Sequence, residues 1–167
     1  MSNISAAQVK ELREKTGLGL MDCKKALEDA EGNMDKAIEE LRKTSGVKAS
    51  KKSGRSAADG LIAIKNIEDQ IFMIEVNCET DFVARDDSFV EFTSQTLKSY
   101  SENPDKTLQE LMDDGIEDNR EKIVQKLGEN IVVRRVAKTE SSTITGSYLH
   151  SNNKIGCIVS LEGGCLL

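Results

Sequence analysis

The 167-residue chain contains no tryptophan, one proline, one histidine and only 4% aromatic residues. Because aromatic side chains are scarce, aliphatic side chains have to supply most of the buried apolar area. His150 alone cannot form the paired-histidine motifs of zinc enzymes. The four cysteines form no Cys-x-x-Cys pair and are widely spaced: Cys23, Cys78, Cys157 and Cys165. We therefore expect no metal site, no cofactor, and cysteines that pack as small buried residues in a reducing compartment.

Long apolar runs and the signature loops of nucleotide enzymes are also absent. No run approaches the roughly 20 apolar residues that a membrane-spanning helix needs, and no signal peptide precedes the first amphipathic pattern. The sequence predicts a soluble, cytoplasmic protein without membrane contact. Neither a phosphate-binding nor a dinucleotide-binding glycine loop is present. Glu79 and Asp81 lie two residues apart, as in helix caps and exposed loops, so we expect no catalytic residues and no enzyme activity.

Charge is divided unevenly along the chain. Residues 1–58 carry a net charge of +3, and the remaining residues carry −9. Residues 42–55 contain six basic side chains and no acidic one. Such a cluster can attract phosphate groups, but no aromatic residues lie between these charges and the rest of the chain is acidic. A solvated basic linker over residues 47–58 is therefore favoured over direct nucleic-acid binding.

The helical spacing of apolar residues predicts a compact three-helix bundle over residues 1–46. Ser5 is a favourable N-cap for the first helix, and Gly17 suits the left-handed position that ends it. Asn33 is a favourable cap for the third helix, which we expect to end before Gly46. A bundle of this size is close to the lower limit for independent folding, so most of its apolar residues have to be buried.

Three apolar residues in the first loop of this bundle have two interpretations. Leu18, Leu20 and Met21 follow the glycine that ends the first helix. One interpretation places at least one of them in the bundle core, and the other exposes them for binding a partner. The residues themselves favour neither interpretation.

Beyond the linker, the pattern changes to an α+β fold. Residues 60–67 and 71–76 are apolar runs separated by a polar turn, which predicts an antiparallel hairpin. Helical patterns and a strand beginning near Ile131 follow, and we assign residues 59–140 to one subdomain of a core. Residues 141–167 contain a second pair of apolar runs, which we assign to the start of another subdomain.

The two hairpins resemble each other, which predicts an internal repeat whose second copy is incomplete. Gly60 begins the first hairpin and Gly146 stands at the corresponding place in the second. A helical pattern follows the first hairpin, whereas the sequence stops soon after the second. We therefore expect a truncated chain, or a hairpin whose open apolar face is closed by another subunit. One hypothesis is that this hairpin self-associates, with Cys165 near the junction.

The stretch Asn77–Asp86 lies between an apolar strand and a helical pattern, and it fits neither period. Loops that rigid elements hold in place often carry the contacts of a protein. Phe82, one of only four phenylalanines, lies within this stretch. The residues alone favour an ordinary strand-to-helix joint in which Phe82 packs back into the core.

Several motifs, in one order, resemble the translation elongation factor Ts family of bacteria. The segment over residues 75–84 reads EVNCETDFVA. The resemblance extends from about Ser5 to Leu161 and rests on residues 9–17, 21–27, 57–60, 75–84, 128–130, 148–150 and 155–156. Motifs of this length in one order are far more specific than a single glycine pattern. After Leu161 the sequence departs from the family, whose bacterial members continue with a helix.

The resemblance implies a guanine-nucleotide exchange factor that acts on elongation factor Tu in protein synthesis. It implies that the first three helices form a module similar to ubiquitin-associated domains, which docks on the nucleotide domain of that GTPase. The chain would bind elongation factor Tu in its GDP-bound and nucleotide-free states, and it would promote GDP release by disturbing the Mg²⁺ and phosphate site. Exchange by this route needs differential binding and no covalent chemistry.

The resemblance also implies which residues contact the partner. Phe82 would act as a wedge near the Mg²⁺ and the phosphates, and Asp81 would anchor its loop. The full set of implied contact residues is Arg13, Leu20, Met21, Thr80, Asp81, Phe82, Val83 and His150. This implication reverses the expectation from the residues alone, since it changes Phe82 from a core residue to a wedge in the partner.

An alternative function is a helical adaptor without exchange activity. Such an adaptor would bind a peptide or a ubiquitin-like partner through residues 18–21, and the α+β part would serve only as a scaffold.

Overall fold

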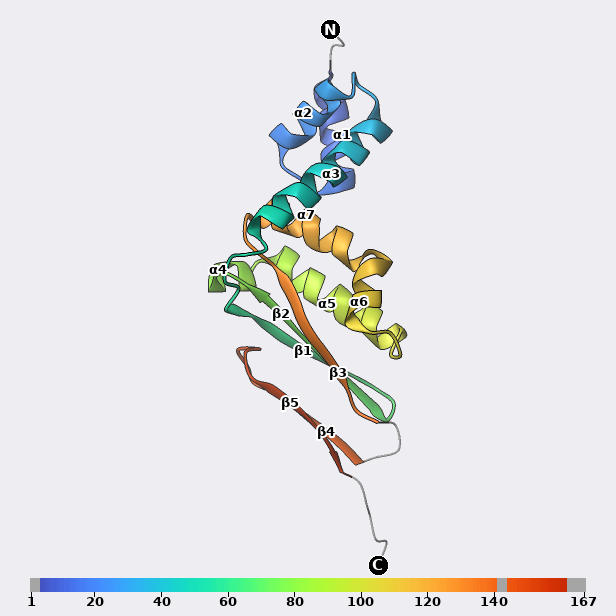
Figure 1. Ribbon diagram of the computed structural model, residues 1–167, viewed down its shortest axis with the longest axis vertical. Coiled ribbons are helices and arrows are strands. Elements are labelled where there is room, and N and C mark those ends of the chain that lie inside the picture. Colours follow the sequence, from blue (N-terminus) through green and yellow to red (C-terminus); the bar gives the residue numbers. More distant parts are fainter. Residues whose placement is uncertain (1–3, 141–143, 162–167) are drawn as a thin grey trace, which may run out of the picture. The chain divides into compact units, whose positions relative to one another are not determined.

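The computed structural model describes residues 4–140 and 144–161 (Figure 1). The α+β fold class is confirmed, with three helices near the N-terminus and antiparallel strands packed with helices. In the described part of the chain, no helix is both long and apolar enough to span a membrane.

The described residues separate into two compact units. The first unit combines the chain up to Arg55 with Asp118–Asn130. The second combines Ser56–Glu117 with the described residues from Ile131 onward. The segment Asp118–Asn130, which we had placed in the core subdomain 59–140, thus belongs to the compact unit of the N-terminal helices.

Four helices form the first unit: α1 (Ala6–Thr16), α2 (Leu20–Asp29), α3 (Met34–Lys52) and most of α7 (Glu117–Leu127). Ser5 caps α1 in a capping box with Gln8, as expected from its position. Gly17 ends α1 with a φ of 69°, and Asn33 caps α3. The predictions that rest on these three capping residues are confirmed.

Leu18 closes the core of the three-helix bundle. Its side chain is only 3% exposed, and it lies in one buried cluster with the apolar side chains Leu12, Cys23, Leu27 and Leu41. The core interpretation of the first loop therefore holds for Leu18.

The predicted end of the third helix before Gly46 is wrong, because α3 continues to Lys52. Ser45 and Ala49 on either side of this glycine are buried. A Cβ atom at Gly46 would lie 3.1 Å from the carboxylate of Glu121 on α7. The glycine therefore leaves room for a side chain from α7, and the first part of the expected linker 47–58 is helical.

The second unit contains a three-stranded antiparallel sheet and a separate two-stranded hairpin. The sheet has the order β1 (Asp59–Ile67), β2 (Gln70–Cys78), β3 (Val132–Lys138). The hairpin pairs β4 (Ile144–Leu149) with β5 (Gly156–Leu161). Both predicted hairpins are confirmed as antiparallel pairs.

Helix α5 (Asp87–Glu102) lies along the three-stranded sheet, and α4 (Asp81–Ala84) lies at one end of its strands (Figure 1). Helix α5 packs on β1 and β2, and the short α4 contacts the same two strands. After α5 come α6 (Leu108–Leu111) and the π-helical segment η1 (Met112–Ile116). Phe72 of β2 meets Tyr100 of α5 edge to face, with ring centroids 5.6 Å apart. Such aromatic contacts add about 0.5–1.5 kcal/mol to the burial itself, so this pair fixes α5 on the first hairpin.

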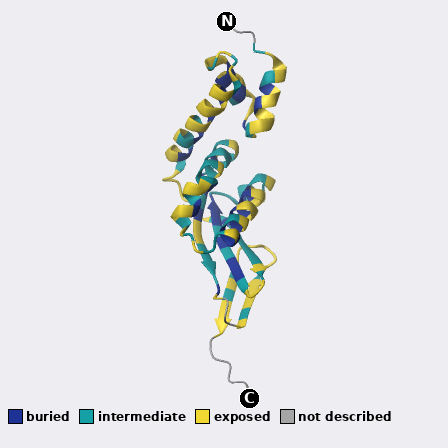
Figure 2. Cartoon of the chain, turned by 90° about the vertical axis from the view of Figure 1, so that its right-hand side faces the viewer, coloured by how far each residue is buried: buried dark blue, intermediate teal, exposed yellow. Residues whose placement is uncertain are grey.

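Most residues of the β4–β5 hairpin are exposed (yellow in Figure 2), and one face of the hairpin is apolar. The side chains that point from this face alternate along both strands and include Ile144, Tyr148, Val159 and Leu161. Self-association through this face stays a prediction, and so does the internal repeat. Cys165 lies outside the described residues.

Gly60 is the glycine that the sheet requires most strictly. It lies opposite Asn77 with a φ of 144°, which side chains rarely adopt. A Cβ atom at Gly60 would lie 2.1 Å from the carbonyl oxygen of Val76. Backbone atoms cannot move away from such a contact without breaking the β1–β2 pairing.

We expect Gly60→Ala to lower the free energy of unfolding by roughly 2–4 kcal/mol, through a strained φ and an overpacked contact. Thermal or urea unfolding measures this loss. Gly146→Ala is the matched control, because that strand glycine has no atoms within 4 Å of an added Cβ. Equal stabilities of the two variants would contradict the proposed role of Gly60.

Candidate functional site

The joint between β2 and α5 is a single helical turn with a cap at each end. Thr80 accepts a hydrogen bond from the Val83 N–H at 3.4 Å and caps α4. Asp86 accepts the Ser88 N–H at 2.8 Å and caps α5. Side-chain caps satisfy backbone donors that would otherwise lack partners in the first turn. The two caps therefore fix the path of the chain on both sides of α4.

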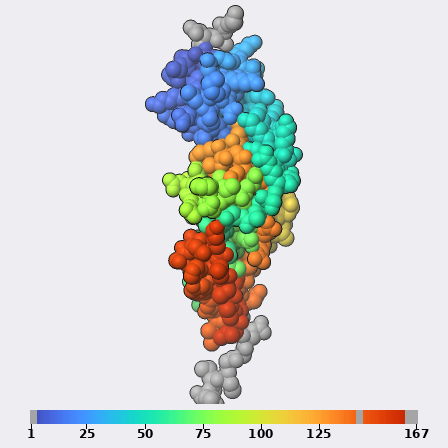
Figure 3. Space-filling model, turned by 90° about the vertical axis from the view of Figure 1, so that its left-hand side faces the viewer, coloured from blue at the N-terminus to red at the C-terminus, as the bar shows by residue number. Residues whose placement is uncertain are grey.

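Phe82 lies on the outer side of this turn and is 81% exposed. The expectation from the residues alone, a Phe82 packed into the core, is wrong. Residues two apart on a helix point in nearly opposite directions, and Ala84 occupies the inward position, where it is buried. The small Ala84 packs on the sheet, so the large Phe82 points to solvent. In the space-filling view, the light-green segment that includes α4 lies at the surface (Figure 3).

Asp81, next to Phe82, is paired with Arg85 within the same turn. The Arg85 Nη2 atom lies 2.8 Å from Asp81 Oδ2, and both side chains are in contact with solvent. Exposed ion pairs of this kind contribute only about 0–1 kcal/mol. Asp81 can therefore exchange Arg85 for a donor on a partner at small cost.

Asn77 holds the end of β2 from which this turn begins. Its Nδ2 atom donates to the carbonyl oxygen of Asp59 at 2.9 Å, and its Oδ1 atom accepts from Arg134 Nε at 2.5 Å. Arg134 also donates to the carbonyl oxygen of Ala57 at 3.0 Å. The buried amide thus ties β1, β2 and β3 together just before Thr80. Asn77 was predicted only as part of the motif over residues 75–84, and Arg134 was not predicted. The available signal was a lone Asn at the end of an apolar strand.

His150 begins the exposed turn between β4 and β5. Its Nδ1 atom lies 2.7 Å from the hydroxyl oxygen of Tyr148. Within the turn, the His150 N–H donates to the carbonyl oxygen of Ile155 at 2.8 Å. These bonds hold the imidazole on the outside of the hairpin.

Lys154, in the same turn, links the hairpin to the start of β1 through an ion pair with Asp59. Its Nζ atom lies 2.8 Å from Asp59 Oδ1 and 2.9 Å from Oδ2. Asp59 pairs in register with Cys78, the last residue of β2. The structure therefore brings the His150 turn and the Thr80–Val83 turn to the same end of the β1–β2 hairpin (Figure 1). Asp59 and Lys154 were not predicted to have this role.

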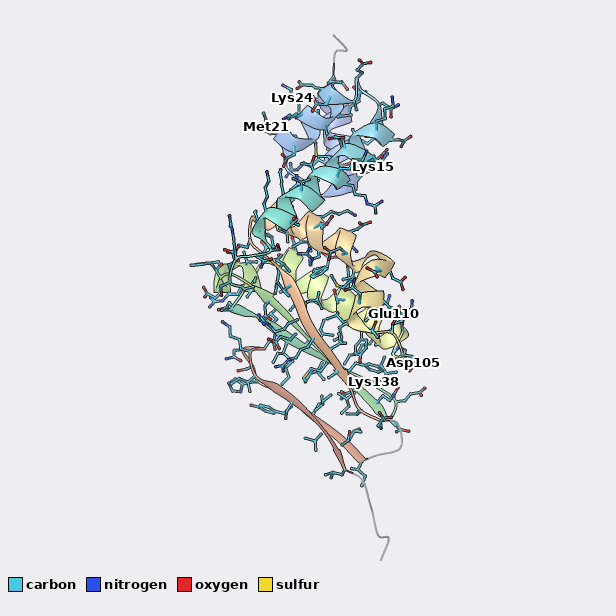
Figure 4. All side chains as sticks on the ribbon, in the orientation of Figure 1. Lys15, Met21, Lys24, Asp105, Glu110 and Lys138 are labelled. Carbon is cyan, nitrogen blue, oxygen red and sulfur yellow. The ribbon has the colours of Figure 1, made fainter. Side chains whose placement is uncertain are left out.

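The first unit carries the other predicted contact residues. Leu20 and Met21 lie in the first turn of α2 and are 52% and 73% exposed, so neither side chain is buried in the bundle core. That they bind a partner stays a prediction. Figure 4 shows Met21 pointing away from the bundle. Arg13 is exposed near the end of α1. The predicted contact residues thus divide between the two units, and all three in the first unit face solvent.

Metal binding finds no support in the described residues, which contain no group of three or more His, Cys, Asp or Glu side chains that could hold an ion. The site thus consists of an exposed aromatic side chain, ion-paired and hydrogen-bonded neighbours, and a second turn that carries His150. Such an arrangement suits contact with the surface of another protein.

The Asp59–Lys154 pair provides a pH-dependent test of this geometry. The hydrogen bond from Lys154, and then that from the Gly60 N–H, lower the pKa of Asp59. A carboxylate with a lowered pKa stabilises the fold above its unfolded-state pKa, about 3.9. That contribution is lost as the pH falls through the lower pKa of the folded protein.

We expect Lys154→Met to raise the pKa of Asp59 towards its ordinary value, as followed by the carboxyl carbon shift in an NMR titration. Lys138→Met is the control, because Lys138 pairs with Asp105 (both labelled in Figure 4) and does not touch Asp59. An unchanged pKa of Asp59 in Lys154→Met would show that Lys154 does not link the turn to β1 through an ion pair with Asp59.

Comparison with known proteins places these residues in a family. A family model described as Elongation factor TS matches residues 79–165, which include the Thr80–Val83 turn and His150. A protein named Elongation factor Ts from Marinobacter nauticus is 54% identical over 166 residues, which cover 98% of this chain and 57% of that protein. The Hahella chejuensis protein of the same name is 51% identical, with 98% and 58% covered.

A third relative, Elongation factor Ts from Arthrospira platensis, is 47% identical over 172 residues, which cover 98% of this chain and 69% of that protein. The chain thus spans a little over half the length of the first two relatives. By the family match and by these identities, the chain belongs to the elongation factor Ts family.

Proposed function

We propose that the chain binds elongation factor Tu and promotes release of its GDP during translation elongation, in the cytoplasm. The observation that carries this proposal is Phe82, an aromatic side chain that is 81% exposed on a turn with a cap at each end. An exposed phenylalanine contributes nothing to the core, and membership of the elongation factor Ts family supplies a reason for its exposure.

The mechanism is thermodynamic linkage. A partner that prefers the nucleotide-free GTPase weakens GDP binding by the same factor by which GDP weakens the partner. The Mg²⁺ ion and its surroundings hold the phosphate oxygens of a bound nucleotide. A side chain that displaces these surroundings therefore lowers nucleotide affinity, and no bond in either protein has to be made or broken.

Phe82 has the properties of a wedge for this purpose. Burial of a phenylalanine side chain in the partner contributes roughly 1.5–3 kcal/mol, which can offset the strain of a displaced element. Asp81 sits beside it in a weak, exposed ion pair with Arg85. It can anchor the turn by exchanging Arg85 for a donor of the partner, while Thr80 and Val83 form the capped backbone of the turn.

The remaining contacts lie outside this turn. Leu20 and Met21 offer an apolar surface on α2, and Arg13 adds a charge on α1. His150 offers an imidazole on a turn held to β1 through Lys154. Contacts at several places on a partner raise affinity without adding to the displacement at the phosphate site, so these residues are assigned to binding and Phe82 to exchange.

Release of labelled GDP from elongation factor Tu tests the proposal. The intact chain should accelerate GDP release. At saturating concentrations, the acceleration by Phe82→Ala should be about 10- to 100-fold smaller than that by the wild-type chain, the factor expected for 1.5–3 kcal/mol. Val90→Ala is the matched control, because Val90 on α5 is an exposed apolar residue outside the turn. Absence of acceleration by the intact chain, or equal losses in the two variants, would refute the proposal.

A further inference from the structure

Asp22 is the third residue of α2, directly after the exposed Leu20 and Met21. An acidic side chain at this position interacts favourably with the helix dipole and can bond to the free N–H groups at the start of its own helix. The N-cap of α2 is Gly19, which offers no side-chain oxygen, and α2 has no side-chain capping bond there. The carboxylate of Asp22 instead points across the unit to two other helices.

Both oxygens of Asp22 accept hydrogen bonds from these helices. Asp22 Oδ1 lies 3.1 Å from Lys48 Nζ on α3, and Asp22 Oδ2 accepts from Gln125 Nε2 on α7 at 3.1 Å. The Oε1 atom of Gln125 in turn accepts a hydrogen bond from Ser45 Oγ, a side chain that is 1% exposed. The chain Asp22–Gln125–Ser45 therefore connects the first turn of α2 to α7 and to the buried middle of α3.

The charge of Asp22 fits this network. Burial alone would raise the pKa of its carboxyl group, but the hydrogen bonds from Gln125 and Lys48 outweigh burial and lower the pKa. The carboxylate is therefore charged at neutral pH, and the amide hydrogen of Gln125 is donated to a full negative charge. Hydrogen bonds to charged groups are stronger than those between neutral groups.

Further contacts hold α7 in the same unit. Arg42 on α3 pairs with Asp118 at 3.0 Å, and Lys52 Nζ lies 3.5 Å from the carbonyl oxygen of Val124. Asn130, just after α7, donates to the carbonyl oxygen of Arg55 at 2.8 Å. The helix α7 is thus attached along its length, and Gln125 contacts the turn that carries Leu20 and Met21 through its hydrogen bond to Asp22.

We propose that Asp22 and Gln125 are positioning residues, whose hydrogen bond holds the first turn of α2 against α7 and so presents Leu20 and Met21 to a protein partner. The partner-binding module is then residues 1–55 together with 118–130. The binding part of this inference rests on the proposed function, whereas the positioning part stands on the contacts of the first unit alone.

Substitutions that reverse the donor and the acceptor of the Asp22–Gln125 hydrogen bond provide the test. Gln125→Glu sets a second carboxylate against Asp22 and breaks the hydrogen bond. The double variant Asp22→Asn with Gln125→Glu restores it in reverse, with the new amide at position 22 as donor. The new carboxylate at position 125 can still accept from Ser45. The control is Gln109→Glu, which breaks an exposed Gln–Asp hydrogen bond with Asp113 in the second unit.

Hydrogen exchange of two amides measures the effect on the turn. The Cys23 N–H makes the first backbone hydrogen bond of α2, to Gly19, and the Val9 N–H makes the equivalent bond of α1, to Ser5. We expect Gln125→Glu to speed exchange at Cys23 about tenfold relative to Val9, and the double variant to restore it. Equal acceleration at both amides, no acceleration, or no restoration would overturn the inference.

Binding to elongation factor Tu provides the functional readout. Disorder of Leu20 and Met21 adds an ordering cost, so the affinity should fall roughly fivefold in Gln125→Glu and recover in the double variant. The rate of GDP release at saturating chain should not change, since Phe82 is untouched. An affinity unaffected by Gln125→Glu would refute the binding part. A wild-type chain that does not bind elongation factor Tu would refute the proposed function, and the ratio of Cys23 to Val9 exchange would still decide the positioning part.

Discussion

The hydrogen bonds of Asn77 are the constraint on which the candidate site depends. Its buried amide binds Asp59 on one side and Arg134 on the other, so three segments distant in the sequence meet at the last residues of β2. A buried amide without partners costs about 1–3 kcal/mol, which makes this arrangement strongly preferred over a slipped one. Gly60 lies opposite and leaves room for the backbone of β2. The place where the chain leaves the sheet, and hence the start of α4, follows from this junction.

The sequence predicted elements that local signals determine and missed those that depend on distant contacts. Capping residues such as Ser5 and Asn33 act within one turn, and the first hairpin needs only a two-residue turn at Glu68 and Asp69. The end of α3 depended instead on α7, which buries Ser45 through a residue 80 positions further along the chain. Gly46 resembles a helix terminator to any local argument, whereas in the structure it gives room to Glu121. The same distance in sequence hid the membership of α7 in the first unit.

Phe82 shows the limit of composition as a guide to burial. A chain with only four phenylalanines is expected to bury each of them, and Phe72, Phe89 and Phe92 are indeed buried. In α4, however, a single helical turn has one inward position, and Ala84 occupies it. Neither periodicity nor polarity could decide between Phe82 and Ala84, because a four-residue helix is too short to show a pattern. The resemblance to a family implied a wedge role for Phe82 in a partner, and the capped geometry of the turn explains how the chain keeps this side chain exposed.

The backbone of α4 is held firmly at both ends, whereas the ion pair on its exposed side is weak. This combination suits displacement of a partner's elements. The caps at Thr80 and Asp86, and the bonds of Asn77 behind them, hold the backbone in place before any partner arrives. A pre-organised turn loses little conformational freedom on binding, so less of the contact energy is consumed in ordering it. The ion pair of Asp81 with Arg85 is by contrast weak and replaceable. If the chain acts on a GTPase as proposed, the strain of association has to fall on the partner. Phe82 would then keep its conformation on binding, and the partner's elements around the nucleotide phosphates would have to move.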